Sequence, residues 1–317
     1  MKKLLCAVAA ALTMTSALAW PDKPVTMVVP FPPRRLHRSD CPHPHPQAAR
    51  QGGRHLRRGQ QGRCHGHHRR GCGGALASGR AHPARDVAGP AGDCPHLLAK
   101  VPYDALKDFD YLTVAVQAPN VLVVPAASPH KSLADVIAFH KAQPGKMTFA
   151  SSGNGSSDHL TAELFWQQTN TSGVHVPYRG GGPVMTDLLG GQVDASFMNI
   201  NTAMPQIQAG KLRALAITSA KRSPLLPQVQ TLEEGGIKDA NVYSWQAFAA
   251  PRGLPADVKA KLHAAIVAGL NDAQVKPKLL DLGFEIVANT PEQFAAYQAA
   301  EFARWKKLIA DRNIKAD

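Results

Sequence analysis

The stretch that decides the fold is Met147-Thr-Phe-Ala-Ser-Ser-Gly-Asn-Gly-Ser-Ser-Asp-His-Leu160 (MTFASSGNGSSDHL). Its first four residues predict a short buried strand, and the polar run 151–157 predicts a turn. The residues that follow have the spacing of a helix as far as Gln167. A strand, a glycine-rich turn and a helix in this order are typical of an α/β unit with a parallel sheet.

The same unit recurs in the chain. Residues 174–178 predict a strand, Arg179-Gly-Gly-Gly-Pro183 predicts a turn that opens a helix, and residues 193–198 predict another strand. On the amino side, residues 110–126 hold two apolar runs separated by Ala118-Pro119-Asn120, a pattern expected of a crossing between two lobes. Ligands of parallel sheets lie at the carboxyl ends of the strands.

Further elements are expected on either side of these units. A buried first strand is expected near residues 23–31, and two more strands follow the central region. The helices are expected at residues 133–143, 256–270, 272–282 and 291–312.

The amino terminus has the pattern of a secretory signal peptide over residues 1–19. Lys2 and Lys3 precede an apolar run, and Ala17-Leu18-Ala19 offers a small-residue cleavage site. We therefore expect an exported protein.

Residues 34–95 differ from the rest of the 317-residue chain. They contain twelve arginines against three aspartates, so they supply +9 of the formal net charge of +13. They also contain eight of the fourteen histidines but no Phe, Trp, Tyr or Ile. Such a segment buries too little apolar surface to offset the entropy of ordering, and we expect disorder.

Four interpretations of this segment compete. A basic arm could bind nucleic-acid phosphates, although it lacks aromatic residues for stacking. A zinc site could use cysteines and histidines between Cys64 and Cys72, although their spacing follows no paired pattern. A solvated linker is the third interpretation.

The fourth interpretation is translation out of frame. Arg, Ala, Gly, Pro, His and Cys are the residues that GC-rich DNA yields in a shifted frame. Back-translation with a shift of one base permits Gly-Thr-Phe-Val-Val-Asp-Asn-Lys-Ala-Gly-Ala-Thr-Gly-Thr-Ile-Gly-Ala for residues 54–70. This shifted-frame sequence has the strand-like runs and glycine turns of a globular domain. The hypothesis is one extra nucleotide near codon 33 and a compensating loss near codons 94–96.

The remaining sequence resembles the tripartite tricarboxylate transporter substrate-binding receptors, the Bug-type periplasmic solute-binding proteins. The resemblance covers residues 20–33 and about 96–317, whereas residues 34–95 depart from the family's pattern. Its motifs are Trp20-Pro-Asp-Lys-Pro-Val-Thr-Met-Val-Val-Pro-Phe-Pro-Pro33, residues 151–160, Val176-Pro-Tyr-Arg-Gly-Gly-Gly-Pro183 and Asp187-Leu-Leu-Gly-Gly-Gln-Val-Asp194.

The resemblance implies a type II-like periplasmic-binding-protein fold, a Venus flytrap of two α/β lobes joined by crossing strands. The first lobe is expected to comprise residues 20–119 and 226–317, and the second residues 120–225. The implied function is capture of a small carboxylate, such as a di- or tricarboxylate or an acidic amino acid, by hinge closure. Delivery to integral-membrane transporter subunits, a periplasmic location and a monomer are expected with it.

The candidate site has four parts. Glycine-rich turns at helix N-termini present converging N–H groups and a favourable dipole to an anion. On the second lobe the candidates are Ser152, Gly153, Asn154, Gly155 and Ser156, although a capped helix start without a ligand is the alternative.

The other candidates are less specific. Tyr178, Arg179 and Gly180 form a second turn, in which Arg179 could pair with a carboxylate or be solvated. Asp194 could receive a ligand hydroxyl or amine, or cap its local turn. Phe31 and Pro32 would bring the first-lobe turn against the ligand.

Other classes of function find less support. Ser156, Ser157, Asp158 and His159 are adjacent and cannot easily present a catalytic triad, and no Gly-x-Ser-x-Gly motif is present. We therefore expect no enzymatic activity, no cofactor, no metal and no nucleic-acid partner. A basic exported nucleic-acid- or metal-binding protein, or a non-functional frame-shifted product, is the alternative.

Overall fold

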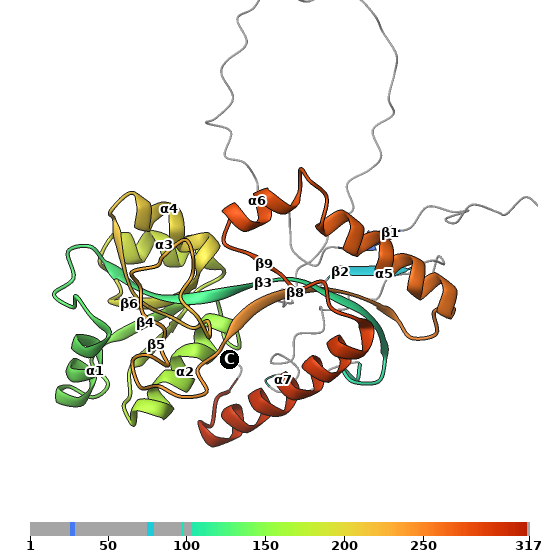
Figure 1. Cartoon of the computed structure of the whole chain (residues 1–317). Coiled ribbons are helices and arrows are strands. Elements are labelled where there is room, and N and C mark those ends of the chain that lie inside the picture. The colour runs from blue at the N-terminus through green and yellow to red at the C-terminus, as the bar shows by residue number, and fades with distance from the viewer. Residues whose placement is uncertain (1–25, 29–74, 79–96, 98–102, 316–317) are drawn as a thin grey trace, which may run out of the picture.

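The computed structural model describes residues 26–28, 75–78, 97 and 103–315 (Figure 1). Phe31, Pro32 and the residues proposed above for nucleic-acid or zinc binding lie outside this part of the chain. Within residues 34–95, where disorder was expected, residues 75–78 form a strand. The remainder of that segment is outside the described residues.

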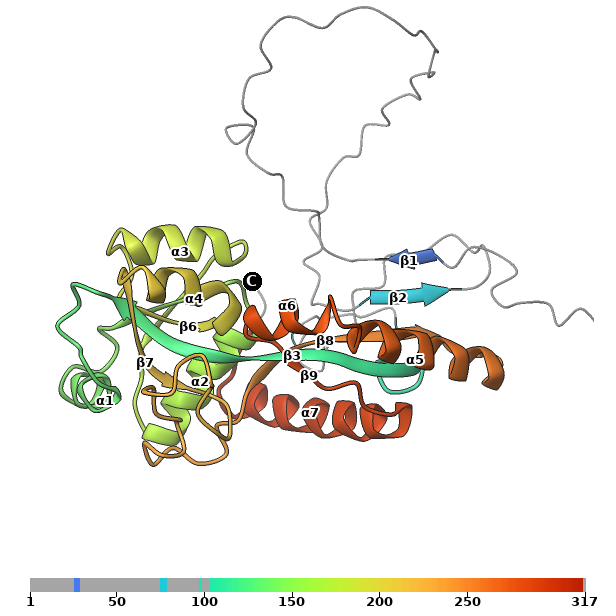
Figure 2. The same cartoon turned by 45° about the horizontal axis from the view of Figure 1, so that its top comes forward.

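One long strand, β3 (Phe109–Pro125), belongs to both halves of the molecule. From Phe109 to Pro119 it pairs antiparallel with β8 (Tyr243–Pro251). From Asn120 onward it pairs with β6 (Ala195–Asn199), and from Val121 with β7 (Leu212–Ile217). The change of partner at residues 119 and 120 coincides with the break between the two apolar runs. Figure 2 shows β3 running through both halves.

The first lobe is built on β8 and the amino-terminal half of β3. Its sheet also contains β1 (Thr26–Val28), β2 (Ala75–Ser78) and β9 (Glu285–Ile286). Strand β2 is parallel to β8 and antiparallel to β1. Helices α5 (Ala256–Leu270) and α7 (Pro291–Asp311) lie on opposite sides of the long strands, and α6 (Lys276–Asp281) follows α5 (Figures 1 and 2).

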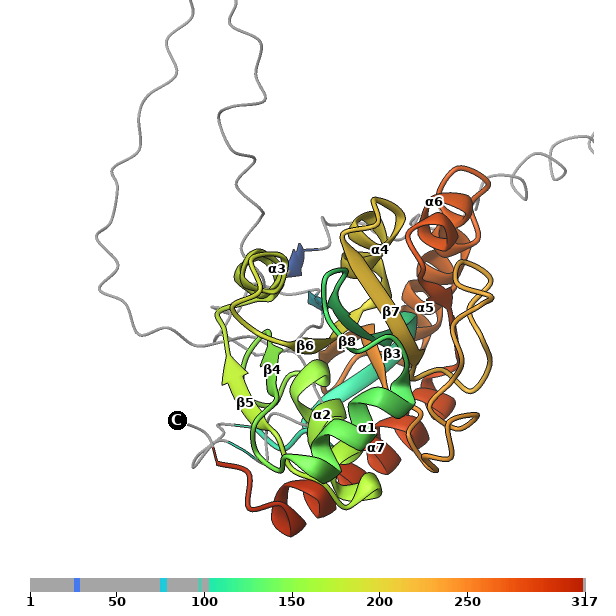
Figure 3. The ribbon, with the colours of Figure 1, turned by 90° about the vertical axis from the view of Figure 1, so that its left-hand side faces the viewer.

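The second lobe has three layers. Its sheet has the order β7-β3-β6-β4-β5, in which β4 (Thr148–Ser151) is parallel to both β5 (Val174–Pro177) and β6. Figure 3 shows α1 (Leu133–Ala142) and α2 (Ser157–Thr169) on one face and α3 (Gly181–Leu189) and α4 (Ile200–Gln208) on the other. The strand, turn and helix units predicted from the sequence are therefore present.

The apolar side chains of β3 pack on both faces of this sheet. Leu122 and Val124 pack against α1 and α2, whereas Val121 and Val123 pack toward α3 and α4. All four are completely buried, as expected of a strand covered on both faces. A continuous apolar run therefore marks the centre of the lobe.

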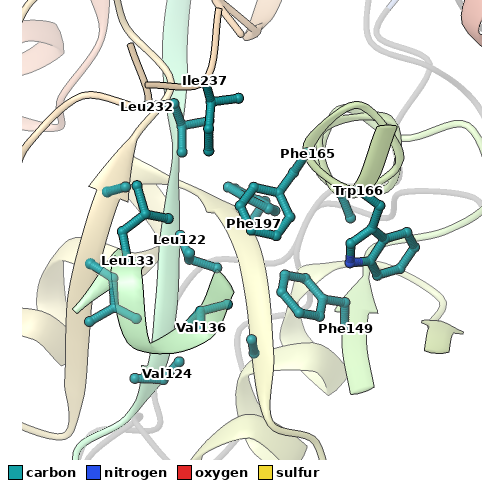
Figure 4. Packing of buried hydrophobic residues seen from close by; sticks show 14 of the residues in the cluster. Leu122, Val124, Leu133, Val136, Phe149, Phe165, Trp166, Phe197, Leu232 and Ile237 are labelled. Atoms are coloured by element: carbon teal, nitrogen blue, oxygen red, sulfur yellow. The ribbon is translucent and has the colours of Figure 1, made fainter. Parts of the chain in front are cut away.

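An aromatic cluster holds α2 against the sheet (Figure 4). The ring of Phe149 on β4 lies 5.4 Å from that of Trp166 and 5.9 Å from that of Phe197 on β6. Phe165 lies 5.6 Å from Phe197. Because these large rings interlock, they hold the carboxyl-terminal half of α2 against β4 and β6.

The return to the first lobe lies later than residue 225. Residues between β7 and β8 pack on the second lobe through Leu226, Val229, Leu232, Ile237 and Ala240. The chain leaves this lobe only when β8 begins at Tyr243. The segment belongs to the second lobe because its apolar side chains are buried there, although it contains no long helix or strand.

Candidate functional site

The site lies at the carboxyl edge of the second-lobe sheet. Strands β4, β5 and β6 are parallel, so the turns that follow them meet at one edge. The last residue of β6, Asn199, is paired with Asn120, the residue at which β3 enters this lobe. The edge that carries the three turns therefore faces the junction between the lobes.

The turn after β4 is held by the side chains that follow it. The carboxylate of Asp158 accepts hydrogen bonds from the Ser152 backbone N–H at 2.6 Å and the Ser152 hydroxyl at 3.0 Å. The Gly155 N–H donates to Nδ1 of His159 at 3.0 Å. Gly153 and Gly155 have φ of 146° and 72°, a region that favours glycine. The sequence Ser-Gly-Asn-Gly is thus needed for the shape of this turn.

Most main-chain donors of this turn already have partners. Besides Ser152 and Gly155, the Gly153 N–H donates to the Ser151 hydroxyl at 3.3 Å, and the Ser156 N–H donates to the Gly153 carbonyl at 3.2 Å. Ser156 also caps α2 by accepting from the His159 N–H. In this structure the residues chosen from the sequence are together, but their amides chiefly stabilise the turn itself.

The turn after β5 is attached to the first one. The Tyr178 N–H donates to the Ser151 carbonyl at 2.8 Å, and the Gly180 N–H donates to the Ser152 carbonyl at 3.0 Å. The Tyr178 hydroxyl donates to Asp187 on α3 at 2.6 Å, which raises the pKa of this tyrosine. The Arg179 side chain is exposed. The two turns therefore form one unit, and the amide of Gly180 is used to join them.

The first turn of α3 supplies further donors. The N–H groups of Gly181 and Gly182 have no hydrogen-bond partner among the described residues. A Cβ added at Gly181 would lie 3.8 Å from the Cγ2 of Thr202 on α4. The amino ends of α3 and α4 are thus neighbours, and both add positive dipole ends to this edge.

A hydrogen-bonded asparagine pair lies beneath these helix ends. Asn199 donates through Nδ2 to Oδ1 of Asn120 at 2.5 Å, and Nδ2 of Asn120 donates to the Thr161 hydroxyl at 2.9 Å. Asn120 is completely buried, whereas Asn199 is partly exposed. Neither asparagine was among the residues selected from the sequence. A polar residue at the carboxyl end of a buried parallel strand is the signal that identifies Asn199.

Charged groups lie behind the first turn. The rings of His159 and His175 are stacked with centroids 3.6 Å apart. Glu163 accepts a hydrogen bond from Arg312, just after α7, at 2.8 Å, and its carboxylate lies 3.7 Å from Nε2 of His159. Burial alone would raise the pKa of Glu163, but the hydrogen bonds from His159 and Arg312 outweigh it and hold the pKa below its ordinary value. Burial raises the pKa of Asp158.

Asp194 lies at the opposite edge of the sheet. It precedes β6, and its carboxylate accepts from the Thr148 N–H at 2.8 Å and the Thr148 hydroxyl at 2.7 Å, at the start of β4. The structure does not bring Asp194 to the other candidates. Of the two roles considered, this placement favours the local structural one.

The serine and histidine side chains here are not arranged as a triad. The Ser156 hydroxyl donates to the Gly153 carbonyl at 2.5 Å, and Asp158 accepts from Ser152 rather than from a histidine. Ser151 does contact Nε2 of His175 at 2.6 Å, but Ser151 is only 1% exposed. A nucleophile at that position would be out of reach of a substrate.

The described residues contain neither a membrane-spanning helix nor a cluster of metal ligands. None of their helices combines the length and apolar character needed to cross a bilayer. No group of three or more His, Cys, Asp or Glu side chains among them is arranged to hold a metal ion.

Comparison with known proteins identifies relatives of the chain. Residues 84–314 match the family described as "Tripartite tricarboxylate transporter family receptor". The chain is 32% identical to protein BugT of Bordetella pertussis over 309 residues, which are 95% of this chain and 92% of BugT.

Solved structures are similar as well. Rpa4515 of R. palustris with adipate superposes with a TM-score of 0.64 at 30% identity, covering 71% of this chain and 76% of that one. MatC of Rhodopseudomonas palustris with bound malate superposes with a TM-score of 0.62 at 29% identity, covering 68% and 74%.

Proposed function

Because the chain belongs to the tripartite tricarboxylate transporter receptor family, we propose that it is a periplasmic receptor that captures a small carboxylate between its lobes. It delivers the carboxylate to integral-membrane transporter subunits, after export directed by residues 1–19. It acts as a monomer and catalyses no reaction.

The observation that carries this proposal is the meeting of three helix N-termini at one edge. Helices α2, α3 and α4 begin directly after parallel strands, at the junction with the first lobe. Helix N-termini attract anions because of their free N–H groups and their dipoles. The amides of Gly181 and Gly182, and Arg179 beside them, are the groups we assign to a carboxylate. The bound adipate and malate of two relatives are both dicarboxylates.

The turn after β4 has a supporting role in this proposal. Ser152, Gly153, Asn154, Gly155 and Ser156 shape the wall of the site and hold the second turn in place. Since most of their amides are satisfied internally, they contribute rigidity more than direct donors. Tyr178 fixes α3 through Asp187 and thereby fixes the amides at its start.

Closure follows from the shared strands. A ligand that contacts both lobes favours the closed state by its difference in affinity for the two states. The change of partner in β3 at residues 119 and 120, with β8 beside it, is the hinge of this motion. Phe31 and Pro32 are the first-lobe contacts we expect.

We further propose that residues 34–95 arise from translation out of frame. Residues 34–83 precede the family match, which starts at residue 84, and the composition of the segment is that of a shifted GC-rich frame. In that case the chain lacks the first-lobe turn that supplies half of the site. Resequencing the gene and peptide mass spectrometry test this hypothesis, and detection of the Arg/His-rich peptides from an intact gene would refute it.

Ligand binding tests the receptor function. Thermal-shift and calorimetric titration with succinate, malate, adipate, citrate, aspartate and glutamate should be run on the chain as it stands and on the chain with the frame restored. We expect saturable stabilisation by at least one carboxylate in the restored form and a negligible response in the other. Absence of binding to every carboxylate in both forms would refute the receptor function.

A further inference from the structure

The hydrogen bonds around Asn120 have a fixed direction. The Thr161 hydroxyl donates its single proton to the Ser157 carbonyl at 2.5 Å. It can therefore only accept from Asn120, which must present Nδ2 to it at 2.9 Å. The other end of the Asn120 amide, Oδ1, consequently faces Asn199.

This direction fixes the orientation of Asn199. An oxygen of Asn120 requires a donor, so Asn199 presents Nδ2 to it, at 2.5 Å. The same Nδ2 lies 3.5 Å from the Ser157 hydroxyl in the first turn of α2. Oδ1 of Asn199 is therefore turned away from Asn120, and it takes no hydrogen bond from a described residue.

The chain around Asn120 is held too firmly for these amides to rotate. The Asn120 N–H donates to the Thr218 hydroxyl at 2.9 Å, and the Thr218 N–H donates to the Asn120 carbonyl at 2.9 Å. The Thr218 hydroxyl donates in turn to the Val242 carbonyl. Rotation of the Asn120 amide would place its Nδ2 against Nδ2 of Asn199, and rotation of the Asn199 amide would place its Oδ1 against Oδ1 of Asn120. Either arrangement leaves the buried Asn120 amide facing a group of its own kind, which is costly.

A second acceptor lies at the N-terminus of α4, next to Asn199. Oδ1 of Asn201, in the first turn of α4, is buried and has no partner among the described residues. A ligand with a hydroxyl or amine can donate a hydrogen bond to one of these side-chain oxygens. A ligand with only methylene groups there leaves the oxygen without a partner. Binding sites that hydrogen-bond a hydroxyl or amine discriminate strongly against analogues that lack it.

We infer that Asn199 sets the ligand specificity of the proposed site, because its side-chain oxygen accepts a hydrogen bond from a hydroxyl or ammonium group of the ligand. The receptor therefore selects hydroxy- or amino-dicarboxylates over unsubstituted dicarboxylates. Asn120 and Thr161 are positioning residues that act through Asn199. The inference rests on the proposed function, since it assigns a ligand class to the same site.

The test compares ligands that differ in one group. Malate and aspartate carry a hydroxyl and an amine on the carbon skeleton of succinate. Calorimetry on the chain with the frame restored should give affinities for malate or aspartate at least about fivefold higher than for succinate, the low end expected when a polar group loses its partner. In Asn199→Ala this ratio should fall to within about twofold.

Two further variants separate a local role from a general one. Thr161→Val removes the acceptor that orients Asn120, so it should lower the malate preference without abolishing succinate binding, and it also serves if Asn199→Ala does not fold. Asn271→Ala, an exposed asparagine after α5, is the matched control and should leave the ratio unchanged.

The outcomes distinguish this inference from the proposed function. Equal affinities for malate, aspartate and succinate in the frame-restored chain, or a ratio unchanged when Asn199→Ala is made in it, would overturn the inference and leave the receptor function standing. No binding of any carboxylate, with the frame as it stands or restored, would refute both.

Discussion

Removal of the Arg312 side chain tests how the end of α7 supports the site. Arg312 lies just after α7, and its guanidinium donates to Glu163 on α2 at 2.8 Å. The side chains are 28% and 13% exposed, so the pair is largely shielded from solvent. In Arg312→Ala, Glu163 keeps His159 beside it but loses the hydrogen bond at 2.8 Å.

The expected cost follows from these contacts. A hydrogen bond to a charged group contributes about 1.5–3 kcal/mol, and loss of one partner of a fully buried pair costs about 3–5 kcal/mol. Because Arg312 is partly exposed and His159 remains beside Glu163, we expect a loss of about 1.5–3 kcal/mol in the free energy of unfolding. The measurement is urea unfolding followed by circular dichroism.

An ion pair on the same helix provides the control. Nζ of Lys307 lies 2.5 Å from Oδ2 of Asp311, and the two side chains are 77% and 37% exposed. Exposed pairs of this kind contribute about 0.2–1 kcal/mol, so Lys307→Ala should cost less than Arg312→Ala. Equal costs for the two variants would show that the pair at Glu163 is no better shielded than a surface pair, and the reasoning would be wrong.

The pH dependence gives a second check on the same pair. The pKa of Glu163 is below its ordinary value in the folded chain. A carboxyl of this kind contributes stability that is present above its unfolded pKa and lost as pH falls through the folded pKa. The difference in free energy of unfolding between the unsubstituted chain and Arg312→Ala should therefore be largest at neutral pH. It should become smaller as pH falls below the ordinary pKa of glutamate.

Three further predictions concern single positions. Gly173→Ala would place a Cβ 2.4 Å from Cζ2 of Trp166 and should cost about 1–3 kcal/mol, whereas Gly269→Ala on α5, with no atom within 4 Å, should stabilise by up to about 1 kcal/mol; thermal unfolding compares them. Because burial raises the pKa of Asp158, the free energy of unfolding of the unsubstituted chain should fall as pH rises from the ordinary aspartate pKa toward the raised one. Asp158→Asn cannot ionise, so urea unfolding between pH 4 and 7 should not show this fall. Asp194→Ala should cost about 1 kcal/mol through its lost bonds to Thr148 while leaving carboxylate affinity unchanged, and a calorimetric change in affinity above about threefold would contradict its placement at the far edge.

The elements of the second lobe could be predicted because local signals agree there. Ser156 precedes a helical pattern and accepts from the third residue of α2, and Ser132 does the same for α1. The crossing at Pro119 was visible as a gap between two apolar runs. Helix α4 was missed because it is short and contains Pro205, so its helical pattern is weak, although Ile200 and Met204 are buried.

The site was predictable only in outline. Glycine-rich turns after strands indicated the correct edge, because parallel strands place their carboxyl ends together. The partners of the amides could not be predicted, since Asp158 and His159 satisfy them through side-chain orientations that spacing does not reveal. Asn199 was missed because its partner, Asn120, lies 79 residues away. Asp194 precedes its strand, and this order alone would have placed it at the far edge.

The sharing of β3 by both sheets has a consequence for the way the molecule loses its structure. Neither lobe can melt alone, because separating β8 from residues 109–119 also removes support from the part of the same strand that pairs with β6. Damage in one lobe should therefore broaden or lower a single transition and should not produce two independent ones. The frame shift proposed for residues 34–95 would thus weaken the second lobe as well, through a strand that both halves need.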